Sequence, residues 1–252
     1  TSRCGSPHGK YCRETVKKCH DRDNRSLDDP GNSMILKTKM AWIIYVVLAL
    51  TSLTAQDLHI TRLQYDGGGD WYANPSSLPN LIHFISTETN IRVAPEEHRV
   101  KITDTDLYNH PYLYMTGHGN VNFSKEAVYK LRDYLTSGGF LHADDNYGMD
   151  DSFRREMKQI FPKKEWVELP HDHPIFSSYF SIANGLRKIH KHNEKAPQAL
   201  ALFHHGRIVV LYTYESDLGD GWEDLEVHKD GEQKHRAALE MGTNILIYAF
   251  TH

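Results

Sequence analysis

The chain has 252 residues, of which 29 are Lys or Arg and 33 are Asp or Glu, so its formal net charge is -4. Hydrophobic residues make up 39% and charged residues 25%, which excludes a disordered, collagen-like or multi-span membrane protein and favours a soluble globular one. The negative total also disfavours a nucleic-acid binder, because such proteins need a clustered positive surface.

The N-terminal segment differs in charge from the rest of the chain. Residues 1–39 carry nine Lys or Arg against five Asp or Glu, whereas residues 56–252 carry 20 against 28. All three cysteines lie in this segment, at Cys4, Cys12 and Cys19, without the CxxC pair of a zinc motif. We expect residues 1–39 to be disordered or an over-extended reading frame, with the natural start at Met34 or Met40.

Residues 40–55 have the features of a secretory signal peptide. A positive flank precedes the uncharged run Ala41–Leu50, and the small residue Ala55 ends the segment. Ten apolar residues are too few for a spanning helix, which needs about 20. We therefore expect an exported protein of the periplasm or cell envelope, with no membrane span after cleavage. Leu53 is larger than usual three residues before the cleavage point, so an uncleaved anchor remains the alternative.

Hydrophobic periodicity predicts alternating strands and helices in residues 56–252. In chain order these are strand 60–65, helix 76–87, strand 100–102, strand 112–115, helix 124–137, strand 140–143, helix 149–160, strand 165–169, strands 199–203 and 207–214 as a hairpin, and helix 236–250. Serines 76, 77 and 124 are candidate helix caps. This alternation predicts a single α/β domain with a mostly parallel sheet and helices on both faces.

Polar loops follow most of the predicted strands. Ligands of open parallel sheets bind beyond the carboxyl ends of the strands, so these loops should converge on a small polar ligand. Aromatic rings beside carboxylates suit a carbohydrate-like ligand, although core packing is the commoner fate of Trp. The candidate ligand-binding residues are Asp66, Gly68, Asp70, Trp71, Gly117, Gly119, Tyr147, Asp217, Asp220 and Trp222.

Four residues are candidates for catalysis: Asp144, Asp145, His118 and His171. Adjacent carboxylates such as Asp144 and Asp145 repel each other, which raises the pKa of one and suits it to act as a general base. His118 or His171 would then carry the proton. In the competing interpretation, one carboxylate caps the next helix, the other faces solvent, and the histidines are structural.

A divalent metal is a further possibility for this part of the sequence. His171 and His173 form a His-x-His pair, which chelates a metal when both side chains point the same way, and Asp144 is the third candidate ligand. Histidines of this kind more often bond the backbone, so a structural role stays open. The carboxylates of residues 217–223 suit calcium but lack the EF-hand spacing, and a solvated acidic turn is the alternative.

Several strings in order carry a resemblance to a known family. They are RLQYDGGGDWY at 62–72, YMTGHG at 114–119, GGFLHADD at 138–145, LPHDHP at 169–174 and SDLGDGWE at 216–223. Over residues 58–251 the chain resembles the bacterial domain-of-unknown-function family DUF4159. The resemblance implies a flavodoxin-like fold similar to the class I glutamine amidotransferases, and it implies no established activity.

The resemblance to the amidotransferases fails at the nucleophile. Residues 117–119 look like their glycine-rich loop, but Asp144 and Asp145 stand at the elbow where those enzymes carry a Cys. No Gly-x-Ser-x-Gly elbow is present either. We therefore expect neither glutaminase nor serine-hydrolase chemistry.

Two functions remain as hypotheses. The first is an exported protein that binds a polar ligand among its carboxylates and histidines and hydrolyses it. The second is a non-catalytic binding or assembly module of a cell-envelope complex that keeps the fold alone. The sequence does not identify a protein partner.

Overall fold

The computed structural model describes Lys39, residues 57–145 and residues 147–252. Apart from Lys39, the predicted N-terminal segment lies outside the described residues, and so does the predicted signal peptide. The strands are β1 (Thr61–Gln64), β2 (His98–Lys101), β3 (Tyr112–Met115), β4 (Phe140–Asp144), β5 (Val167–Glu168), β6 (Gln198–His204) and β7 (Arg207–Tyr214). The helices are α2 (Ser77–Glu88), α3 (Lys125–Thr136), α4 (Asp150–Ile160), α5 (Leu218–Trp222), α6 (Leu225–His228) and α7 (Glu232–Thr251), with 3-10 turns at Leu107–Asn109 and Pro174–Phe176.

The strands form one seven-stranded sheet in the order β2-β1-β3-β4-β7-β6-β5. Neighbouring strands from β2 to β7 pair in parallel, whereas β6 runs antiparallel to both β7 and β5. The predicted α/β class, with a mostly parallel sheet and a hairpin formed by β6 and β7, is therefore confirmed.

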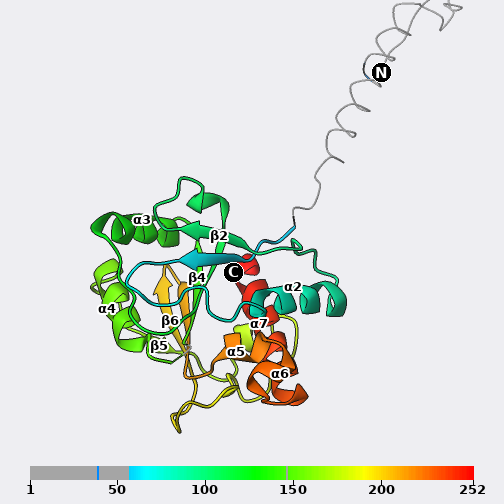
Figure 1. Ribbon diagram of the computed structural model, residues 1–252. Helices are drawn as coiled ribbons and strands as arrows, with labels where there is room; N and C mark the ends of the chain where they lie inside the picture. The colour runs from blue at the N-terminus through cyan, green and yellow to red at the C-terminus, as the bar shows by residue number, and fades with distance from the viewer. Residues whose placement is uncertain (1–38, 40–56, 146) are drawn as a thin grey trace, which may run out of the picture. The chain divides into compact units, whose positions relative to one another are not determined.

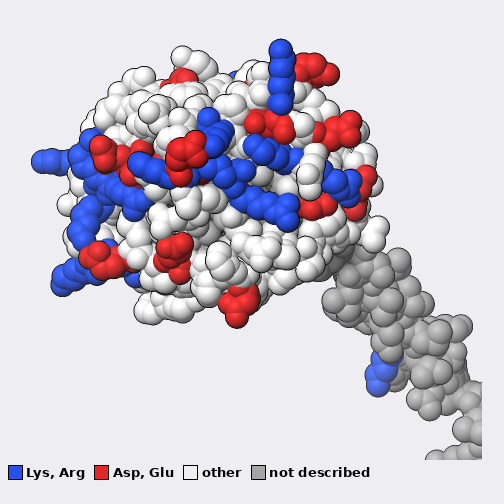
Figure 2. Space-filling model, turned by 90° about the horizontal axis from the view of Figure 1, so that it is seen from below, with Lys and Arg blue, Asp and Glu red and all other residues white. Residues whose placement is uncertain are grey.

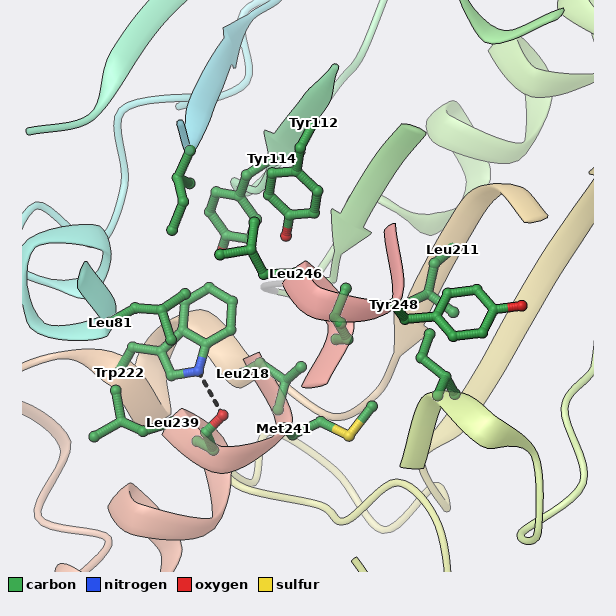
Figure 3. Close-up of a cluster of buried hydrophobic side chains, with 14 of the residues drawn as sticks. Leu81, Tyr112, Tyr114, Leu211, Leu218, Trp222, Leu239, Met241, Leu246 and Tyr248 are labelled. Carbon is green, nitrogen blue, oxygen red and sulfur yellow. Dashed lines mark hydrogen bonds between the residues drawn. The ribbon is translucent and has the colours of Figure 1, made fainter. Parts of the chain in front are cut away.

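Helices cover both faces of the sheet, as the buried strands require (Figure 1). On β3, Tyr112 and Tyr114 face the core that contains the buried side of α2 and α7. Leu113 and Met115 face the opposite core, beneath α3 and α4. Because side chains alternate along a strand, an uninterrupted apolar run supplies both cores at once. Figure 3 shows the first of these cores, packed around Trp222.

The helix caps are only partly as predicted. The Ser124 hydroxyl accepts a hydrogen bond from the Ala127 N–H at 3.1 Å and caps α3. Neither of the two serines at the start of α2 caps that helix through its side chain. Instead the Ser76 hydroxyl donates to Glu223 at 3.2 Å, and the Ser77 hydroxyl donates to the Asn74 carbonyl at 2.7 Å. These serines tie the start of α2 to the loop after β1 and to the segment after β7.

The structure also contains two short helices that periodicity did not predict. α5 and α6 lie within the acidic segment after β7, and α5 is too short to show a hydrophobic period. Among the described residues, no helix is both long and apolar enough to cross a membrane.

Positive and negative side chains are mixed on one face of the molecule. Figure 2 shows Lys and Arg side chains forming a band across that face, with Asp and Glu beside and between them. Positive charge on this face is therefore interrupted by acidic side chains.

Candidate functional site

Four neighbouring strands, β1, β3, β4 and β7, end at the same edge of the sheet, and their following loops touch. The Asp70 carboxylate accepts from the backbone N–H of His118 and lies 3.0 Å from His118 Nδ1. The Asp70 N–H donates back to the His118 carbonyl at 3.2 Å. The loops after β1 and β3 are thus joined by a carboxylate–imidazole pair, which leaves the Nε2 of a half-exposed His118 for solvent or a ligand.

A glycine permits this close approach. Gly117 has φ of +140°, and a Cβ there would overlap the Tyr65 hydroxyl and lie 2.9 Å from the Asp70 carbonyl oxygen. Of the other predicted loop residues, Asp66 joins the same two loops through its carbonyl, which accepts from the Asn122 N–H at 2.8 Å. Gly68 and Gly119 also have positive φ, with open space at Gly68. The glycine-rich segment therefore serves at least the packing of two loops.

Asp144 ends β4 and is fully buried. Its Oδ1 accepts from the Thr213 hydroxyl at 2.5 Å and from the Leu218 N–H at 3.2 Å, and its Oδ2 accepts from the Gly219 N–H at 2.6 Å. Burial raises the pKa of Asp144 to about 7, although these three donors lower it. Asp144 therefore holds the first turn of α5, a helix that lies 74 positions further along the chain.

A buried hydrogen-bond chain leads to Asp144 from inside the sheet. Because the Thr213 hydroxyl donates to Asp144, it must accept from His142 Nε2, 3.0 Å away. His142 Nδ1 then accepts from the Tyr112 hydroxyl at 3.0 Å. Burial lowers the pKa of His142 to about 3, which keeps the ring neutral as this chain requires. Every donor in the chain points towards the Asp144 carboxylate.

Asp145 is the adjacent carboxylate, and its surroundings differ. It is 3% exposed, and its Oδ1 has no hydrogen-bond partner among the described residues. Burial, followed by repulsion from Asp150 and Glu215, raises the pKa of Asp145 to about 6. Hydrogen bonds with the Tyr212 side chain and the Met149 backbone lower this pKa, whereas a buried carboxylate oxygen without a partner is costly to the fold.

A second carboxylate pair comes from the segment after β7. His192 Nε2 lies 2.8 Å from Asp217 Oδ2 and 4.0 Å from Asp220 Oδ2. Asp220 Oδ1 accepts from the Asn74 amide at 2.8 Å, and His228 Nδ1 lies 3.3 Å from Asp220 Oδ2. Burial raises the pKa of both Asp217 and Asp220, and repulsion from Asp220 raises that of Asp217 further. The predicted residues Asp217 and Asp220 therefore lie together and contact imidazoles.

The aromatic candidates divide between surface and core. Tyr147 is half-exposed, and its ring stacks on His192 with centroids 5.0 Å apart. Trp71 is partly buried against the core beneath α3 and α4, in edge contact with exposed Tyr72. Trp222 is fully buried, and its indole N–H donates to the Ala238 carbonyl at 2.7 Å (Figure 3). The prediction of Trp222 as a ligand-binding residue was wrong, because its ring belongs to the core.

The structure does not place His171 and His173 with the other candidates. His173 Nδ1 accepts from the Ile175 N–H at 3.2 Å, and its ring packs on Tyr248 of α7. His171 packs against Gly185. Both histidines follow β5, which lies three strands from β4, and neighbouring strands are about 4.8 Å apart. Strand order therefore places the loop with His171 and His173 away from the end of β4, and the contacts of these two histidines named above do not include Asp144.

Sequence reasoning missed two histidines that lie beside the acidic pair, one of them in contact with it. His190 and His192 form a His-x-His pattern of the same kind as His171 and His173. They lie in an irregular segment between β5 and β6, where periodicity gives no placement. Sequence alone thus offered two equivalent pairs, and only the tertiary fold distinguishes them.

Comparison with known proteins agrees with the resemblance seen in the motifs. No curated protein matches this sequence. The family model described as "Domain of unknown function (DUF4159)" matches residues 59–250, which include every strand and helix named above up to the last turn of α7. Since this match covers well over half of the chain, the protein belongs to the DUF4159 family.

Proposed function

We propose that this protein binds a polar ligand at the carboxyl edge of its sheet and hydrolyses it, with Asp145 as the general acid or base. The observation that carries the proposal is the buried Asp145 Oδ1, which has no partner among the described residues. Burial and neighbouring carboxylates bring its pKa to about 6, near the working pH of a proton-transfer group.

His118 is the second group of the proposed site. Its Nδ1 faces Asp70, so the carboxylate fixes the ring and leaves Nε2 to exchange a proton with a ligand. This is the orienting arrangement that acid–base histidines commonly have. Asp70, His118 and Asp145 come from three loops that follow neighbouring strands, as a shared site requires.

A carbohydrate-like ligand suits the exposed aromatic rings. Tyr147 and Tyr72 are 52% and 64% exposed, and both lie in loops that follow strands of this edge. Such rings offer apolar faces to a sugar, while carboxylates accept hydrogen bonds from its hydroxyls.

The test is a panel of mono- and oligosaccharides, with thermal shift to detect binding and reducing-end release to detect hydrolysis. We expect Asp145→Asn to abolish hydrolysis while the protein still folds. Asp151→Asn, an exposed carboxylate in the first turn of α4, is the matched control and should keep full activity. Hydrolysis that survives in Asp145→Asn at the wild-type rate would refute the assignment.

The competing function is a non-catalytic binding or assembly module. Asp144 favours it, because both of its oxygens accept hydrogen bonds from Thr213 and α5 and so stabilise the fold. Saturable sugar binding without any turnover, unaffected by Asp145→Asn, would support this module.

We further propose that the protein is exported. The uncharged segment 40–55, preceded by positive charge and ended by Ala55, supports a signal peptide. Cell fractionation with N-terminal sequencing should find a chain that starts at Gln56 outside the cytoplasm. A cytoplasmic chain that retains residues 40–55 would contradict export.

A further inference from the structure

Two histidines that have no assigned role gather with an aspartate beside the proposed site. His190, His192 and Asp220 each offer one ligand atom, and these three atoms lie within 4.8 Å of one another. We propose that they form a binding site for a divalent first-row transition metal, with Zn²⁺ as its representative ion.

Two flanking side chains orient the proposed ligands. Asn74 donates to Asp220 Oδ1 at 2.8 Å, so Oδ2 is the oxygen directed at His192. Asp230 Oδ2 lies 2.7 Å from His190 Nδ1, which fixes the proton on that nitrogen and leaves the Nε2 lone pair for a metal. A ligating His whose other nitrogen donates to a carboxylate is the common arrangement in metalloproteins, because it sets the tautomer and the ring orientation.

The chemistry of the ligands selects the class of ion. Two imidazoles and one carboxylate suit Zn²⁺ or another first-row divalent ion, whereas Mg²⁺ and Ca²⁺ prefer sites built from oxygen alone. Tetrahedral zinc with bonds of about 2.1 Å keeps its ligand atoms about 3.4 Å apart. The His192 Nε2–Asp220 Oδ2 distance is 4.0 Å, so small side-chain rotations bring these atoms into range.

A nearby carboxylate favours a cation at these ligands, and one of the ligands is exposed to solvent. Asp217 Oδ2, buried and 2.8 Å from His192 Nε2, adds a second carboxylate beside the three ligands, and this hydrogen bond gives way when the nitrogen binds the ion. His192 is exposed, so an ion can reach the three ligand atoms from solvent on its side of the cluster.

The experiment measures Zn²⁺ binding to the full chain without an affinity tag. Cys4, Cys12 and Cys19 are first alkylated, because free thiols would bind zinc on their own. Equilibrium dialysis with elemental analysis, at micromolar free Zn²⁺, should give one tightly bound ion per chain. Excess Mg²⁺ should not displace it, and displacement by Mg²⁺ would overturn the assigned ligand set.

Variants locate the ion. His192→Ala, at an exposed position that should not unfold the protein, is expected to weaken Zn²⁺ binding by more than about 100-fold. Asp230→Asn, which changes the partner of the outer nitrogen of His190 and also removes an ion pair with Lys234, should weaken it by about 10–100-fold. His205→Ala is the matched control, because His204 and His205 form a surface pair with rings 4.1 Å apart that competes for metal. This control should leave the affinity unchanged.

A second measurement needs no variant. Modification of histidines by diethyl pyrocarbonate, mapped by mass spectrometry, should show His190 and His192 protected by Zn²⁺ and His83 unprotected. Wild-type protein that binds no zinc, or zinc affinity that survives in His192→Ala, would overturn the site. Zinc binding is measured without a substrate, so it does not depend on the proposed hydrolysis. The proposed metal site and the proposed hydrolysis can therefore be refuted separately.

Discussion

Asp144 and Asp145 are adjacent in the chain and serve different purposes. Asp144 accepts three hydrogen bonds and anchors α5, whereas Asp145 has an oxygen without a partner among the described residues. Pleating explains the difference, because successive side chains at the end of a strand point to opposite sides. Of the two predicted carboxylates, Asp145 is therefore the one to which we assign proton transfer in the proposed function.

The buried hydrogen bonds that run from Tyr112 through His142 and Thr213 to Asp144 should stabilise the folded protein, and Thr213 lies in the middle of them. Thr213→Val removes the acceptor of His142 and one donor of Asp144, so unfolding should become easier by about 1–3 kcal/mol. Thr243→Val is the matched control, since the Thr243 hydroxyl is also buried but only donates to the Leu239 carbonyl within α7. Urea unfolding of both variants measures the free energy of unfolding. An equal decrease in the two variants would show that the connected hydrogen bonds contribute no more to stability than a single one.

For single residues, the sequence shows which side chains are candidates for the site but not which groups they contact. Asp144 and Asp145 could be found because they follow an apolar strand directly. The partners of Asp144 could not, because Leu218 and Gly219 contribute backbone N–H groups, which any residue type supplies. The pairing of His192 with Asp217 joins two segments without periodicity, so only the folded chain reveals it.

At the scale of elements, strand order decides which loops meet. β1, β3, β4 and β7 are consecutive in the sheet, so the loops that follow them are neighbours at one edge. β5 follows β6 at the far edge, and this position separates His171 from the other candidates. A sequence shows where strands end but not their lateral order, because pairing is set by long-range packing.

This order predicts different outcomes for two histidine variants. His118→Ala should abolish hydrolysis of any sugar that the wild-type protein cleaves, because it removes the Asp70-oriented imidazole. His171→Ala should leave the rate unchanged, since its side chain packs beside Gly185. Initial rates of reducing-end release distinguish them, and equal rates in both variants would remove His118 from the site.

α5 packs closely on the sheet at Gly219, so a larger side chain there should destabilise the protein. At Gly219 a Cβ would lie 2.7 Å from both the Tyr114 hydroxyl and the Asn74 amide. Gly219→Ala should therefore displace α5 and lower stability by about 1–3 kcal/mol. Because Asn74 holds Asp220, the same variant should also weaken Zn²⁺ binding. A thermal midpoint equal to that of the wild type would show that α5 adapts freely.

For the whole molecule, residues 56–252 form a compact unit by themselves. Their two cores lie on opposite faces of one sheet and are supplied by helices within the same range. The alternation of strands and helices was enough to predict this architecture, because both faces of a parallel sheet must be buried. We expect residues 56–252, expressed alone, to melt cooperatively in circular dichroism, and an unfolded or insoluble product would contradict this.

If Asp145 is kept for function, its buried charge should cost the folded protein stability. Its pKa is about 6 in the folded protein, above the ordinary 3.8, so the folded state binds the proton more tightly than the unfolded state. Stability is therefore lost as pH rises from about 4 to about 6, and the loss persists at higher pH.

Asp145→Asn tests this claim most directly, because it removes the charge and keeps the shape. The free energy of unfolding, measured in urea at pH 4 and pH 8, should match the wild type at pH 4 and exceed it by about 1–3 kcal/mol at pH 8. Hydrolysis should be lost in the same variant. A variant that is less stable than the wild type at pH 8, with activity intact, would show that Asp145 is structural and would contradict its proposed role in proton transfer.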